Sequence, residues 1–206
     1  MMSRWTRKSI VTARHGWCPI KMIRIILACS LYLFSYTNVR ADFDAQIRLV
    51  NFLHQDELKI HRAVALIKKV VASKEFKERV LHHTYQGKKV FIDNKGLSNE
   101  QIYQTIMDGA ESLVPEKNGT MDVELELYQQ SNTTIGFTYP DTNRIWMNKK
   151  YFEKYTPIQV ADNLTHEWLH KLGFEHAATY SQTRNYSVPY AIGYLMEELA
   201  AKYNTP

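Results

Sequence analysis

The segment from His166 to His176 constrains this chain most, because it reads H-E-x-x-H-x-x-G-x-x-H with every fixed position filled. Residues four apart share one face of a helix, so His166 and His170 would point their imidazoles at a common position. Gly173 is the residue type that most readily takes a positive φ and ends a helix. The chain can then turn and bring His176 back to the same position. The spacing therefore predicts three imidazoles around one metal ion.

Three neutral imidazoles with an open fourth position form the ligand set of a catalytic zinc site. Glu167 adjoins the first ligand and is placed to take a proton from a zinc-bound water. The alternative is a helix whose last histidines are solvated, because the helix dipole favours cations at that end. We expect Zn²⁺ to be bound by His166, His170 and His176, with Glu167 as the catalytic general base.

The residues before the motif predict that it lies on a real helix. Thr156 is placed as an N-cap, Pro157 as the first helical residue and Gln159 as the second half of a capping box. The apolar positions recur at helical spacing: Ile158, Ala161, Leu164, Trp168, Leu169 and Leu172. The polar positions fall mainly on the other side and are expected to face a cleft: Asn163, His166, Glu167 and His170.

The N-terminal 41 residues have the composition of a secretory leader. They contain seven Lys/Arg and no acidic residue, and the apolar run 22–36 precedes an acceptable cleavage site at 39–41. The run is short for a membrane span, although a permanent anchor is the alternative. Translation could begin at Met1 or Met22. We expect export, to the periplasm or outside the cell, with cleavage near residue 41.

Removal of this leader changes the net charge and the cysteine content of the remaining chain. The whole chain has 26 Lys/Arg and 21 Asp/Glu, so the remainder keeps 19 against 21, a net charge of −2. A basic charge therefore gives no reason to expect nucleic-acid binding. Both cysteines, Cys18 and Cys29, lie in the leader, so the exported part would have neither a disulfide nor a thiolate ligand. We expect a monomer with no stable membrane span and with a hydrophobic core of its own.

Hydrophobic periodicity divides the chain into a leader (1–41), a helical N-terminal segment (42–85) and a catalytic domain (86–206). The segment 42–85 could be a propeptide that masks the cleft or a permanent part of the fold. Further helices are expected at about 98–113 and 189–203. Strands are expected at 89–93, 122–129, 134–139 and 144–148, the last two forming a hairpin. The strand 144–148 is either an open edge that could pair with a peptide or an ordinary covered strand.

Other candidate residues have two interpretations each. Asp162, four residues before His166, could orient that imidazole or simply complement the helix dipole. Four further histidines are expected to be solvated rather than metal-binding: His54, His61, His82 and His83.

The long motif and the order of elements over about residues 86–206 resemble the metzincin clan of zinc metallopeptidases. The resemblance implies an α+β domain with a small mixed sheet, an active-site helix and a C-terminal helix. It also implies a methionine-containing turn beneath the metal. Here the counterpart is Ser187-Val188-Pro189-Tyr190, with Pro189 where the methionine is expected. Tyr190 is a candidate for a phenol that contacts the oxyanion, as in some relatives, or a core tyrosine.

These inferences predict an exported zinc-dependent metalloendopeptidase whose partner is a peptide or protein substrate. It would hydrolyse peptide bonds with a zinc-bound water that Glu167 activates. A non-catalytic, zinc-stabilised binding module is one alternative, and the glutamate counts against it because zinc binding alone does not need that carboxylate. A zinc hydrolase acting on non-peptide amides is another.

Overall fold

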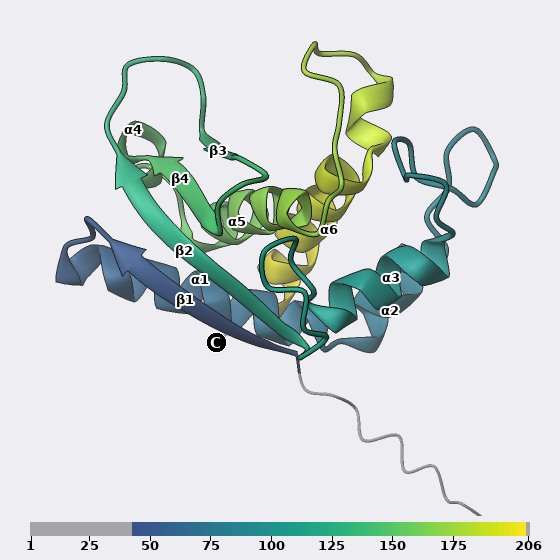
Figure 1. Ribbon diagram of the computed structural model, residues 1–206, viewed down its shortest axis with the longest axis horizontal. Coiled ribbons are helices and arrows are strands. Elements are labelled where there is room, and N and C mark those ends of the chain that lie inside the picture. Colours follow the sequence, from purple (N-terminus) through teal and green to yellow (C-terminus); the bar gives the residue numbers. More distant parts are fainter. Residues whose placement is uncertain (1–42, 205–206) are drawn as a thin grey trace, which may run out of the picture. The chain divides into compact units, whose positions relative to one another are not determined.

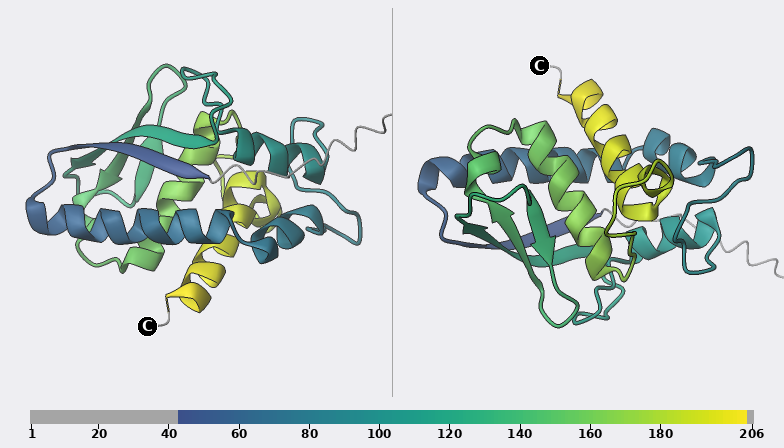
Figure 2. Two further views of the ribbon diagram at one scale, coloured as in Figure 1. Left: turned by 90° about the horizontal axis from the view of Figure 1, so that it is seen from below. Right: turned by 90° about the horizontal axis from the view of Figure 1, so that it is seen from above.

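The structure is a computed structural model that describes residues 43–204. The predicted leader and both cysteines lie outside the described residues. The described part is a mixed α/β unit in which helices pack on one face of a four-stranded sheet (Figures 1 and 2). The strands are β1 (Asp44–Val50), β2 (Thr120–Tyr128), β3 (Gly136–Thr138) and β4 (Arg144–Asn148). The helices are α1 (His54–Val71), α2 (Lys74–Leu81), α3 (Asn99–Asp108), α4 (Lys149–Phe152), α5 (Pro157–Lys171), a short 3-10 turn (Thr183–Tyr186) and α6 (Val188–Tyr203). No helix among these residues is long and apolar enough to cross a membrane.

The sheet has the strand order β1-β2-β4-β3. The strands β1, β2 and β4 are parallel, and β3 pairs with β4 in the antiparallel direction. The predicted hairpin before the zinc helix is therefore confirmed, and so is the strand near 122–129, whose Val123, Leu125 and Leu127 are buried. The idea that 144–148 forms an open edge is wrong, because β4 lies between two partners. The unpaired edge on this side belongs to β3.

The sequence predicted a helical N-terminal segment, and this prediction is wrong for its first residues. Residues 44–50 form β1, the other edge strand, which pairs with β2 in a register of Asp44 opposite Thr120. Its side chains alternate between exposed and half-buried, and Asn51 takes a positive φ of 62° before α1 begins. The apolar residues of α1 follow closely at helical spacing, so the whole stretch is interpreted as helical and the alternation of residues 44–50 is overlooked. Because β1 belongs to the sheet and α1 packs against α5 and α6, residues 43–85 share one core with residues 86–204.

The segment 89–93 does not form the predicted strand. Only Ile92 makes a β-bridge, with Ser187, and its amide donates to the carbonyl of Tyr186. The bridge joins this loop to the start of α6. The helix expected at 98–113 has the predicted capping box at Ser98 but ends earlier, because Gly109 takes a left-handed conformation at its C-cap.

The zinc-motif helix α5 is buried between the sheet and α6. Its Trp168 is fully buried, and the indole Nε1 donates to Oε1 of Glu111 at 2.6 Å. The same carboxylate oxygen accepts from the backbone amide of Asp122 at 3.0 Å. Burial raises the pKa of Glu111, while these two donors oppose the rise. This buried acid thus joins α5 to β2 directly behind the motif.

A close approach between α5 and α6 leads to the first testable prediction. A Cβ on Gly193 would lie 2.6 Å from Oδ1 of Asp162. Glycine to alanine in a helix normally stabilises by about 1 kcal/mol, but crowding of a packed site costs about 1–3 kcal/mol. We expect Gly193→Ala to lower the free energy of unfolding, measured by denaturant titration. In an Asp162→Ala background the same change should stabilise the protein, and stabilisation in the wild type would contradict this packing.

Candidate active site

The local signals that predicted α5 are all present in the structure. The Thr156 side chain accepts from the Gln159 amide and the Gln159 side chain accepts from the Thr156 amide, which completes the capping box. At the other end Gly173 has a φ of 88°, which only glycine adopts easily. The amide of Phe174 then donates to the carbonyl of Leu169 at 3.0 Å, and the chain reverses. This reversal returns the third histidine to the helix.

The three histidines converge as the spacing predicted. Nε2 of His166 lies 3.1 Å from Nε2 of His176, and a ligand atom from each of the three residues lies within 4.8 Å of the others. Nitrogens at about 2.0–2.1 Å from a tetrahedral zinc ion are about 3.3–3.4 Å apart. Among residues 43–204 this is the only group of three or more such side chains that could hold a metal ion. The donor set and spacing fit zinc.

Two of the three imidazoles are held by their second ring nitrogen. Nδ1 of His170 lies 2.7 Å from the carbonyl oxygen of Phe174, and Nδ1 of His176 lies 3.1 Å from that of Ala177, which leaves Nε2 of each free for a metal. Burial lowers the pKa of the His166 imidazole, and the nearby backbone of Pro189 opposes this fall without cancelling it. Pro189, which stands where the methionine was expected, therefore supplies backbone to the site.

The site keeps its first two imidazoles neutral. Burial, followed by the neighbouring His170 and His176, lowers the pKa of His166 to about 3. Burial also lowers the pKa of His170, against the opposing effect of the Phe174 carbonyl. A neutral imidazole is the form that binds a metal. The environment therefore favours metal binding without any proton having to be displaced at neutral pH.

Glu167 lies in the same cleft and is only 6% exposed. Burial raises the pKa of its carboxyl to about 8, and the positive charge of Lys171 opposes the rise. A divalent cation among the imidazoles would further favour the carboxylate. An acid whose pKa lies near the working pH is suited to take up and return a proton.

Tyr190 also lies where the sequence suggested. Its ring centroid is 4.5 Å from that of His166 and 4.6 Å from that of His176. Burial raises the pKa of its phenol, and Arg184 opposes the rise. The guanidinium of Arg184 lies 4.6 Å from the Tyr190 ring and lines the cleft. Sequence reasoning missed this arginine, which lies in the short 3-10 turn Thr183–Tyr186 and belongs to no motif. The role of Tyr190 on an oxyanion stays a prediction.

A cleft of about 890 Å³ contains these groups. One wall is the edge strand β3 with its flanking loop, residues 133–140, and the floor is α5. Lys171 was not singled out in the sequence, yet it is buried and holds this wall in place. Its Nζ donates to the carbonyls of Tyr139 and Thr142, in the turn that joins β3 to β4. The end of the zinc helix thus positions the hairpin beside the cleft.

The remaining candidates make no hydrogen bond to the proposed metal ligands. The structure gives no hydrogen bond between Asp162 and His166, so the orienting role that the sequence allowed is not observed. His54, His61 and His82 are exposed, as expected. His83 is not fully solvated: it is half-buried, with its ring stacked 3.9 Å from that of Phe91.

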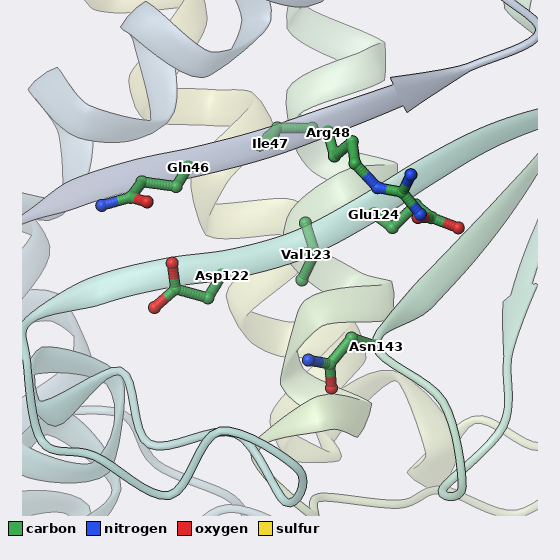
Figure 3. Close-up of a pocket in the computed structure, with 7 residues that line it drawn as sticks. All are labelled: Gln46, Ile47, Arg48, Asp122, Val123, Glu124 and Asn143. Atoms are coloured by element: carbon green, nitrogen blue, oxygen red, sulfur yellow. The ribbon is translucent and has the colours of Figure 1, made fainter.

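A second hollow lies on the open face of the sheet, opposite the helices (Figure 3). It follows β1 and β2, and it shares no residue with the cleft. Its largest charged group, Arg48, pairs with Glu124, which also pairs with Arg144. These charges pair with one another, and no histidine lines the hollow to bind a metal ion.

Comparisons with known proteins find structural likenesses among solved chains, including the following one. The structure is similar to that of a zinc peptidase from Grifola frondosa, with 13% sequence identity and a TM-score of 0.41. The match covers 74% of this chain and 98% of that chain. No protein-family profile matches the sequence, and no curated protein matches it. At this level of similarity the functional argument depends on the site itself.

Proposed function

We propose that this protein is an exported zinc-dependent endopeptidase. The observation that carries the proposal is the convergence of three imidazole nitrogens beside a buried glutamate, inside a cleft bounded by a strand edge. The ligands would be His166, His170 and His176. Export is supported by the leader-like composition of residues 1–41.

Zinc held by these imidazoles would supply a Lewis acid that acidifies water and polarises a carbonyl group. The protein's own residues would do the rest. Glu167 would accept the proton of the attacking water and later deliver it to the leaving amine. The Tyr190 phenol would donate a hydrogen bond to the negative charge that develops on the carbonyl oxygen. Arg184, stacked on that phenol, would add positive charge on the same side.

The edge strand β3 supports a peptide as the substrate. Its outer side has no strand partner among the described residues and lines the cleft. An extended peptide could add to this edge through main-chain hydrogen bonds, which are independent of sequence. Such pairing would hold a scissile bond over the floor formed by α5. A small non-peptide amide would gain nothing from this wall.

Metal analysis combined with a cleavage assay tests this function. We expect the purified protein to contain one zinc ion and to cleave a reduced, unfolded protein. A chelator should stop the cleavage, and added zinc should restore it. Zinc binding without any hydrolysis would favour a binding module, and hydrolysis of small amides alone would favour the other alternative. Cleavage that the chelator does not affect would contradict the proposal.

A further inference from the structure

Asp162 is a carboxylate in the cleft that the proposed chemistry does not use. It lies on α5 one turn before His166 and lines the same cavity. Its side chain is half-buried and so partly withdrawn from water, yet it makes no hydrogen bond or ion pair with any residue of the range 43–204. Buried carboxylates are normally paired, because removal of the charge from water is costly.

The surroundings of Asp162 destabilise its ionised form. Gly193 on α6 leaves the space into which Oδ1 points. Burial first, and then the negative charge of Glu197, raise the pKa of Asp162 to about 7. Arg184 lines the cleft as well, but it lies beyond 4.0 Å from this carboxylate and forms no ion pair with it. The cleft thus contains an acid that lacks a cation.

A basic side chain of the substrate would provide that cation. The position of Asp162, about 6 Å along the helix axis from His166, is close enough for a residue next to the scissile bond. Lysine carries its ammonium on a flexible four-carbon stem, and arginine reaches similarly far. The tyrosines beside the acid, Tyr190 and Tyr194, offer ring surface for such a stem.

We propose that Asp162 is a specificity-determining residue that selects substrates with lysine or arginine beside the scissile bond. The proposal rests on the proposed function, since it assigns a substrate class to the same cleft. It requires the carboxylate to pair with the cation inside the cavity, where a charge pair is only weakly screened by solvent. Glu175, a more exposed acid of the same cleft, would contribute little by comparison.

Two zinc-directed probes test this without any turnover. Lysine hydroxamate and norleucine hydroxamate share the metal-binding group and nearly the same chain length, and differ in the ammonium group. Calorimetry on the zinc-loaded protein should give about tenfold tighter binding of the lysine probe, corresponding to one partly desolvated charge pair. Asp162→Asn should remove this preference, and the matched variant Glu175→Gln should retain it.

Each outcome decides the proposal. Equal affinity of the wild type for the two probes would overturn it, and this result needs no variant to fold. A preference that survives Asp162→Asn, or weak binding of both probes to the zinc-loaded protein, would overturn it too. If the probes discriminate as expected but no peptide is cleaved, the cation site stands and the proposed peptidase function fails.

Discussion

Replacement of Glu167 by Gln is expected to lower kcat by about 10²–10⁴-fold, the range that one general acid–base group contributes. The amide keeps the size of the side chain but cannot accept the proton of the attacking water. Zinc content should not change, because the three imidazoles do not depend on this carboxylate for their orientation. Steady-state hydrolysis of an unfolded protein, together with metal analysis, checks both parts.

Glu116→Gln is the control for this variant. It makes the same chemical change at an exposed acid that does not line the cleft and makes no hydrogen bond or ion pair with the proposed metal ligands. Its kcat should stay within a few-fold of the wild type. Substantial hydrolysis by the Glu167 variant would exclude that residue as the general base.

Replacement of His176 by Ala is expected to weaken zinc binding by more than about 100-fold. Loss of a residue that only orients a metal ligand costs up to about 100-fold in affinity, and loss of a ligand itself should cost more. Two helical imidazoles would remain, but the return of the chain after Gly173 would no longer close the site. Competition against a chromogenic chelator measures the loss. Zinc should also no longer raise the melting temperature, since ligand binding stabilises the folded state by mass action.

His61→Ala provides the comparison, because His61 is an exposed histidine on α1. This variant should bind zinc like the wild type. If loss of His176 left the affinity unchanged, the third ligand would have to be a different group, and the three-histidine site would be wrong.

The zinc helix could be predicted because its signals are local. The Thr156 cap, the proline after it and the glycine turn at 173 each act within a few residues. Convergence of the three imidazoles follows from helical spacing and one reversal of the chain. Local chemistry was therefore sufficient to place His166, His170 and His176 together.

The parts that could not be predicted depend on distant partners. Residues 44–50 become a strand because β2 provides a parallel neighbour, and nothing in the local pattern announces that pairing. The position of 144–148 inside the sheet depends on β2, which pairs in parallel with the side of β4 that the hairpin leaves open. Strand propensity is weak beside such tertiary contacts.

The same reason explains what was missed in the site. The lack of a partner for Asp162 is a property of the packed cleft, and so is the contact of Arg184 with Tyr190. The backbone of Pro189 affects the pKa of His166, and an effect of the backbone cannot be predicted from residue types.

Anomalous diffraction at the zinc edge, on crystals of the purified protein, tests the central claim most directly. We expect one peak about 2.0–2.1 Å from the Nε2 atoms of His166, His170 and His176. Glu167 should lie beside the metal without binding it. A zinc peak held by other side chains, or no peak in crystals grown with zinc, would contradict the account.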